Sequence, residues 1–202
     1  MSRAPLQIAG QPLEAVRARL EPLLQEGDLI FLDTDRYLFK RVAEATGGWT
    51  SHVGTVFREA GGWVVYESTF PLSRRTPLAA YLRRTTGARL AVMRLEGGLD
   101  GAQRERLRAA AARRLGRLYH WGFDLDSRRQ FCSKYVHEVF REALGVTLGR
   151  VETFDGLMRR NPRRARRFWR LWYLGRIPLG RRTLSPQSLL EDPRLEAVLE
   201  SR

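Results

Sequence analysis

The chain has few residues with which to bind metals or form cross-links. Its 202 residues include a single cysteine, Cys132, and three histidines, His52, His120 and His137. One cysteine cannot form an internal disulfide or a zinc cluster of several thiolates. The histidines lack the H-x-x-x-H spacing with which two histidines of one helix hold a metal. We therefore expect no metal site and no bound cofactor.

Long apolar runs are absent as well. No stretch of 18 apolar residues occurs, so we expect no membrane-spanning segment. Residues 1–10 lack the apolar stretch of a secretory signal peptide. These absences favour a cytoplasmic protein, with a peripheral position at a membrane as an alternative.

Acidic residues are outnumbered by basic ones. The chain has 36 lysines and arginines against 22 acidic residues, and only Lys40 and Lys134 are lysines. The formal net charge of +14 favours anionic partners, either nucleic acid or an anionic membrane surface. Hydrophobic residues make up 43% of the chain, which is enough for an ordinary core and excludes a disordered protein.

Apolar periodicity predicts one α+β domain. The length suits a single domain, with residues 1–26 as an N-terminal helical extension and 27–202 as the main domain. Strands are expected at 29–32, 52–57, 63–68 and 89–95. Helices are expected at 12–25, 35–46, 77–85 after a Thr76 N-cap, 99–118, 131–144, 153–173 with a break at 161–162, and from 185 onward.

Cys132 lies in the first turn of the helix expected at 131–144. There the helix dipole and the free backbone N–H groups favour a thiolate, and a thiolate nucleophile needs a base and a group that orients the base. His137 follows five residues later, so it lies well around the helix from Cys132. His52 is therefore the better candidate base.

A carboxylate is expected beside His52. If residues 60–61 form a two-residue turn between the strands, position 52 opposes position 69. Glu67 is then the diagonal neighbour of His52 on the same face of the sheet. A buried hydrophobic role for Cys132 and a structural role for His52 are the ordinary alternatives, and the pattern alone leaves both open.

Several motifs carry a family resemblance. They are GDLIF at 27–31, SHVGTV at 51–56, YES at 66–68, LYHWGF at 118–123, FCSKYV at 131–136 and WYLGRIP at 172–178. Together they resemble the YiiX/YebB-like amidase family, the permuted NlpC/P60 group of papain-like cysteine hydrolases, from about residue 27 to residue 190. In unpermuted relatives the cysteine helix precedes the strands, so the order His, Glu, Cys implies circular permutation.

The resemblance implies a fold, a site and a reaction. Over 27–202 it implies a circularly permuted papain-like fold, with a small antiparallel sheet packed against the cysteine helix. It implies Cys132 as nucleophile, His52 as general base and Glu67 as the residue that orients His52. The implied reaction is hydrolysis of an amide, peptide-like or lipid-linked, through an acyl-enzyme. A lipid acyltransferase or thioesterase of the same fold is the alternative.

The donors that would stabilise the oxyanion are predicted only in part. The backbone N–H of Cys132 is the first donor, because the amides at a helix N-terminus are free. The sequence leaves the second donor open among Tyr119, His120, Gln130 and the backbone near Asp33.

An arginine-rich segment at 159–182 has ten arginines and no acid. Its aromatic residues, among them Phe168, Trp169 and Trp172, interleave with the charges. The segment could bind an anionic membrane surface. Alternatively, its aromatic residues pack on the core and its arginines form a solvated face. Nucleic acid is the less favoured partner. A non-catalytic basic module that binds membrane or nucleic acid is the non-enzymatic alternative, and the oligomeric state stays open.

Overall fold

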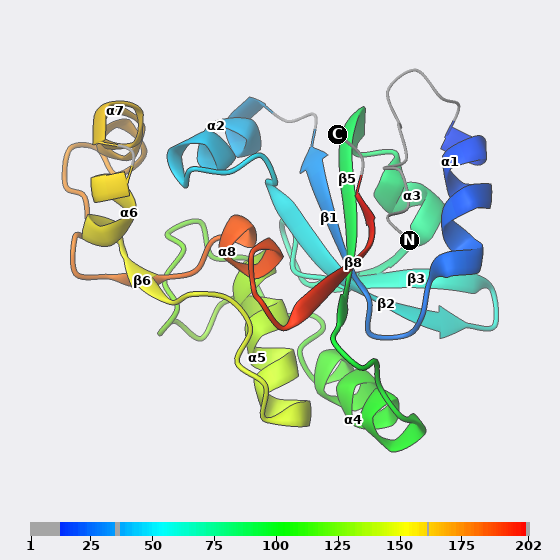
Figure 1. The fold of residues 1–202 in the computed structure, drawn as a ribbon. Coiled ribbons are helices and arrows are strands. Elements are labelled where there is room, and N and C mark those ends of the chain that lie inside the picture. Colours follow the sequence, from blue (N-terminus) through cyan, green and yellow to red (C-terminus); the bar gives the residue numbers. More distant parts are fainter. Residues whose placement is uncertain (1–12, 35–36, 161, 201–202) are drawn as a thin grey trace.

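A six-stranded antiparallel sheet forms the centre of the molecule (Figure 1). The computed structural model describes residues 13–34, 37–160 and 162–200. In spatial order the strands are β4 (Arg74–Pro77), β3 (Gly62–Glu67), β2 (His52–Glu59), β1 (Leu29–Thr34), β5 (Thr85–Leu95) and β8 (Leu195–Glu200). A two-stranded sheet joins β6 (Glu152–Thr153) and β7 (Arg182–Thr183).

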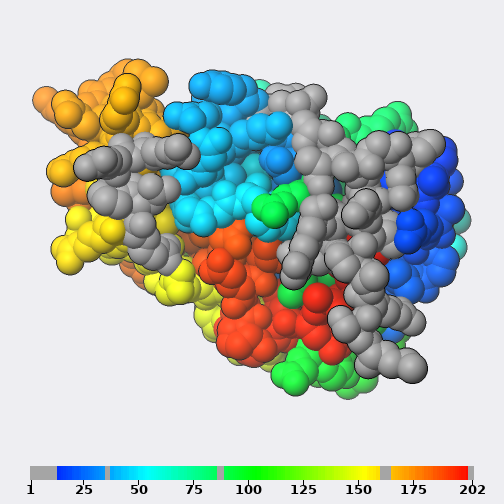
Figure 2. Space-filling model, turned by 45° about the horizontal axis from the view of Figure 1, so that its top comes forward, coloured from blue at the N-terminus to red at the C-terminus, as the bar shows by residue number. Residues whose placement is uncertain are grey.

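Helices cover both faces of this sheet (Figure 1). Their bounds are α1 Leu13–Leu20, the 3-10 helix Glu21–Leu23, α2 Tyr37–Ala45, α3 Leu78–Leu82, α4 Gly101–Ala112, α5 Cys132–Leu144, α6 Phe154–Arg160, α7 Pro162–Trp172 and α8 Pro186–Leu190. Helices α2 and α7 lie side by side at one end of the molecule (Figures 1 and 2).

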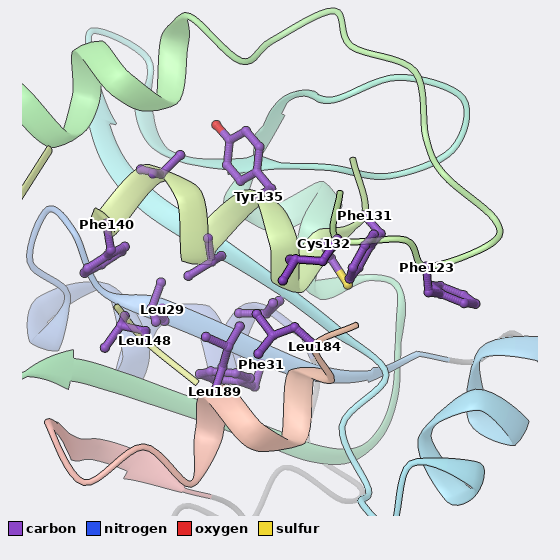
Figure 3. Packing of buried hydrophobic residues seen from close by; sticks show 14 of the residues in the cluster. Leu29, Phe31, Phe123, Phe131, Cys132, Tyr135, Phe140, Leu148, Leu184 and Leu189 are labelled. Carbon is purple, nitrogen blue, oxygen red and sulfur yellow. The ribbon is translucent and has the colours of Figure 1, made fainter. Parts of the chain in front are cut away.

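Strand alternation divides the core between the two faces. One face presents Phe31 and Phe57 to the apolar stripe of α5, which includes Tyr135 and Phe140. Figure 3 shows Phe31 below α5, with Tyr135 and Phe140 on the helix. Helix α5 begins after Phe131, whose extended backbone cannot continue a helix towards the N-terminus. Successive strand residues point to opposite faces, so the intervening residues form a second core.

The second core lies under α1 and α3. Ile30 and Val65 of the sheet pack there with Val16 and Leu20 of α1 and with Tyr81 of α3. Helix α1 thus belongs to the hydrophobic core of the sheet, and the predicted boundary at residue 26 stays a prediction.

The α+β class and the antiparallel sheet against the cysteine helix are confirmed. The predicted helix at 77–85 is wrong at both ends, because Pro77 is the N-cap and the chain leaves the helix after Leu82 to pair with β1. The helix predicted from 185 onward is right only for α8. Residues 195–200 form the edge strand β8 instead, because they pair with β5 and bury Leu195 and Leu199 against the sheet.

Other predicted boundaries also changed. Pro22 ends α1 early, since the helix gives way to a 3-10 turn. Strand β4 was not predicted. Positions 12, 35–36 and 161, which belong to predicted helices or to their break, lie outside the described residues. None of the helices in the described part of the chain combines the length and the apolarity needed to cross a bilayer.

Candidate active site

Cys132 is the first residue of α5 and is 4% exposed. Figure 3 shows it at the start of the helix, beside Phe131. The first bond of the helix runs from the Tyr135 N–H to the Phe131 carbonyl, at 2.9 Å. The N–H groups of Cys132, Ser133 and Lys134 therefore have no partner within the helix, and they direct the positive end of its dipole at the sulfur.

The hairpin of β2 and β3 places His52 beside Glu67. Glu59 pairs with Gly62, so the turn is the two-residue turn predicted at 60–61. The register makes Glu67 the diagonal neighbour of His52 on one face, as predicted. His52 Nε2 lies 2.5 Å from Glu67 Oε2, and both side chains are buried.

His52 reaches Cys132 at the end of its strand. By alternation His52 belongs to the face covered by α3, where its ring packs against Tyr81, with ring centroids 5.7 Å apart. Helix α5 covers the other face. His52 and Cys132 meet because His52 is the first residue of β2, where the sheet ends. Glu67 occupies Nε2, so Nδ1 is the nitrogen left for the thiol.

The protonated form of His52 is strongly stabilised. Burial by itself lowers the pKa of His52, but hydrogen bonding with Cys132 and Glu67 and their negative charges outweigh it. The net result raises the pKa of His52 to about 9. At neutral pH the ring is therefore an imidazolium.

Two residues that the sequence analysis missed hold Glu67. The Thr76 hydroxyl donates to Glu67 Oε1 at 2.6 Å, and Arg84 donates from Nη1 to Oε2 at 2.9 Å and from Nη2 to Oε1 at 2.5 Å. Burial raises the pKa of Glu67, but the bond and charge of His52, followed by those of Arg84, lower it to about 2. Strand β4 pairs Arg74 with Glu67, and its alternation places Thr76 on the same face; recognition of β4 would have found this contact.

The remaining histidines do not join the pair. His137 Nδ1 lies 2.6 Å from the carbonyl oxygen of Leu148, which fits its predicted orientation away from Cys132. His120 Nδ1 accepts a bond from the Asp124 N–H at 3.2 Å, and burial lowers the pKa of its half-buried ring.

Three of the candidate oxyanion donors are used elsewhere. The backbone N–H of Tyr119 donates to Pro71, that of His120 to Gln130 and that of Gln130 to Leu118. The Gln130 side chain also donates its amide, to the hydroxyl of Ser73 and the carbonyl of Arg114.

The phenol of Tyr119 is a donor of another kind. Its hydroxyl has no hydrogen-bond partner among the described residues, and Tyr119 lines two hollows, one of which is also lined by Cys132 and the other by His52. Burial and the charge of Cys132 raise the pKa of Tyr119 well above its usual value. The phenol thus keeps its proton and can donate it in a hydrogen bond.

The two hollows differ in chemistry. The first, here called the apolar slot, is narrow; Cys132 lines it, with apolar side chains that include Val42, Phe131, Leu157 and Trp169. The second, here called the arginine pocket, is larger, with a free volume of about 240 Å³, and opens to solvent. It is lined by Thr34, Phe39, His52, Thr69, Phe70, Arg74, Arg84 and Tyr119. Phe39 and Tyr119 line both hollows, which therefore adjoin.

The arginine-rich segment packs its aromatic residues inward. Trp169 is 1% exposed and forms part of the apolar slot, and the half-buried Trp172 donates its indole N–H to the Trp121 carbonyl at 3.0 Å. The arginines with described side chains in α7 are exposed, as are Leu171 and Leu174. The aromatic residues of this segment thus pack in the core. Binding of an anionic membrane to its exposed arginines stays a prediction.

Comparisons with known proteins identify the class. The model of a family described as permuted papain-like amidase enzymes, YaeF/YiiX, C92 family, matches residues 23–199. The chain belongs to this family, and the predicted family and permuted papain-like fold are confirmed. A closer resemblance to YebB stays a prediction.

Two relatives extend the comparison. The chain is 30% identical to the uncharacterized protein YiiX of Escherichia coli K12 over 174 residues, which cover 86% of this chain and 85% of the relative. The crystal structure of the metalloprotein yiiX from Escherichia coli O157:H7 is similar with a TM-score of 0.81 and 29% identity. The match covers 88% of this chain and 97% of that one.

The absence of a side chain at Gly54 lets Glu67 lie against β2. A Cβ at this position would contact the Val65 side chain and lie 3.3 Å from Cβ of Glu67. We expect Gly54→Ala to lower the free energy of unfolding by about 1–3 kcal/mol through overpacking, measured by urea denaturation. In Gly61→Ala, where the added Cβ meets nothing within 4 Å, the change should stay below about 0.5 kcal/mol. Equal effects of both substitutions would contradict this account.

The buried carboxylate predicts an acid-dependent loss of stability. The pKa of Glu67 is lowered from 4.5 to about 2 by folding, so its contribution is complete above about pH 4.5 and is lost as the pH falls towards 2. The stability advantage of the wild type over Glu67→Gln should therefore shrink by up to about 3 kcal/mol over this range. Urea denaturation between pH 2.5 and 6 measures it, and a constant difference would refute the assignment.

Proposed function

We propose that the protein is a cysteine amidase that acts through an acyl-enzyme on Cys132, with His52 as proton carrier and Glu67 as the residue that orients it. The observation that carries the proposal is the chain of contacts at the end of the sheet. A buried thiol lies at a free helix N-terminus, an imidazole interacts with it, and a buried carboxylate holds the other ring nitrogen. Membership of a family of permuted amidases supports the same reaction class.

Acylation begins from an ion pair. With a pKa of about 9, the His52 ring already holds a proton at neutral pH. In the proposed reaction the sulfur of Cys132 acts as a thiolate nucleophile beside this imidazolium. The sulfur attacks the amide carbonyl and forms the C–S bond. The imidazolium gives its proton to the amide nitrogen, the C–N bond breaks, and the amine leaves.

Deacylation reverses the role of His52. The neutral ring accepts a proton from a water molecule as the water oxygen attacks the thioester carbonyl. The C–S bond then breaks, the carboxylic acid leaves, and the thiolate and imidazolium are restored. Glu67 keeps Nε2 engaged throughout, so Nδ1 faces the reacting atoms in both half-reactions.

Two donors suit the oxyanion. The N–H of Cys132 is free at the helix N-terminus, and the Tyr119 phenol is a protonated donor at the junction of the two hollows. The hydrogen bonds from both donors would strengthen as the carbonyl oxygen gains negative charge.

The apolar lining of the slot suits an acyl group with little polarity. Cys132 lines this slot, and the carbonyl carbon becomes bonded to its sulfur, so the acyl part lies on this side. Thioester hydrolysis and acyl transfer share the same acyl-enzyme and remain the second candidate functions, because an apolar acyl group fits them equally. They differ only in the leaving group and in the acceptor.

A metal does not fit the described residues. The similar structure of yiiX is that of a metalloprotein, but no group of three or more His, Cys, Asp or Glu side chains in the described part of this chain could hold a metal ion. Moreover, Glu67 Oε2 bonds His52 Nε2 directly, which engages two of the available donors. No step of the proposed reaction passes through a metal.

The roles of the three residues predict graded losses. With decanoyl 4-nitroanilide as substrate, Cys132→Ala should abolish release of 4-nitroaniline. His52→Ala should lower kcat/KM by about 10³-fold and Glu67→Gln by about 10- to 100-fold, because the carboxylate only orients and supports the ring. Intact mass spectrometry of the wild type should show one decanoyl group on Cys132. Turnover by Cys132→Ala, with circular dichroism showing a folded protein, would refute the mechanism.

The phenol of Tyr119 predicts a defect in the chemical step. Tyr119→Phe should lower kcat by about 10²-fold with little change in KM, because the donor acts on charge that develops in the transition state. Tyr66→Phe is the matched control, since the Tyr66 hydroxyl bonds Glu59 at 2.7 Å and Tyr66 lines neither hollow. An unchanged kcat in Tyr119→Phe would refute the phenol as an oxyanion donor and leave the Cys132 N–H in that role.

A further inference from the structure

We infer that the arginine pocket is a binding site for an anionic group on the amine part of the substrate, with Arg74 as the residue that recognises it. This inference rests on the proposed amidase function and names the class of its substrate. The substrate would be an amide between an apolar acid and an amine that bears a carboxylate or a phosphate.

The reaction assigns the two parts of the substrate to the two hollows. The acyl carbon becomes bonded to Cys132, which lines the apolar slot. The proton for the leaving amine comes from His52, which lines the arginine pocket and does not line the slot. A group that receives its proton from His52 must lie beside it, so the amine part extends into the arginine pocket.

The charges of this pocket are unbalanced in favour of an anion. Its lining has two guanidinium groups and the imidazolium of His52, and none of its lining residues is acidic. Glu67 lies behind the wall and is fully buried. Its carboxylate already accepts from His52, Thr76 and both terminal nitrogens of Arg84. The single negative charge of Glu67 thus offsets one of the three positive charges, and the positive charge that remains is most exposed at Arg74.

Arg74 has the freedom to bind a ligand. Its nearest carboxylate oxygen among the described residues is Glu67 Oε1, 4.0 Å from Nε, at the limit of an ion pair. Its side chain is 51% exposed at the open pocket. The Arg84 side chain is 26% exposed and binds Glu67 with both terminal nitrogens. A guanidinium presents a planar set of donors that matches the two oxygens of a carboxylate or phosphate.

The neighbouring residue provides a matched control. Arg75 is on the same strand and is 58% exposed, but alternation directs it to the other face, where it lies 3.6 Å from Glu59. Replacement of Arg74 or Arg75 by glutamine removes one positive charge from the same strand. Only Arg74→Gln removes it from the pocket.

Three decanoyl amides test the inference. N-decanoylglycine carries a carboxylate, N-decanoyl-O-phosphoethanolamine carries a phosphate, and N-decanoylglycinamide is neutral. We expect the wild type to hydrolyse at least one anionic amide with kcat/KM about tenfold or more above the neutral one. Arg74→Gln should bring this ratio close to 1, and Arg75→Gln should keep it. The comparison of the carboxylate with the phosphate identifies the favoured anion.

The outcomes separate the inference from the amidase proposal. Equal kcat/KM for anionic and neutral amides in the wild type, or the same loss of preference in both variants, would overturn the anionic site while the amidase stands. If no amide is hydrolysed, calorimetry of the same three amides with the Cys132→Ala variant tests the anionic site by binding alone. Tighter binding of an anionic amide that disappears in Cys132→Ala with Arg74→Gln would support the site without the amidase, and equal binding would overturn it.

Discussion

The fully buried carboxylate of Glu67 is the constraint on which the site depends. A buried charge left without partners costs several kcal/mol, so the surrounding chain must supply donors in a fixed geometry. Glu67 receives them from the start of β2, from β4 and from the residue two positions after α3. One side chain thereby ties three segments together and fixes which nitrogen of His52 faces Cys132.

The part of the site that is local in sequence could be predicted, and the part that depends on an edge strand could not. A two-residue turn fixes the side-chain parity of a hairpin, so His52 and Glu67 could be assigned to one face without a structure. Thr76 was missed because β4 is four residues long, mostly exposed and basic, with no apolar alternation, and its role appears only once β4 is paired with β3. Arg84 was missed because it lies after the end of α3, at a position that was predicted to be helical.

The helices show the same division. The strong apolar stripe of α5 and the cap at Gly145 made the cysteine helix predictable. In the arginine-rich segment, charge and aromatic content could not say which face is inside. The burial of Trp169 shows which face of α7 is inside. That face forms a wall of the apolar slot, and the other face carries exposed arginines.

The permuted order of the chain has a consequence for its synthesis. His52, Glu67, Thr76 and Arg84 lie within 33 consecutive residues, all of which a ribosome completes before it reaches Cys132. The imidazole and the carboxylate can satisfy each other in the nascent hairpin, with no contribution from α5. The proposed nucleophile is therefore the last of these groups to be made.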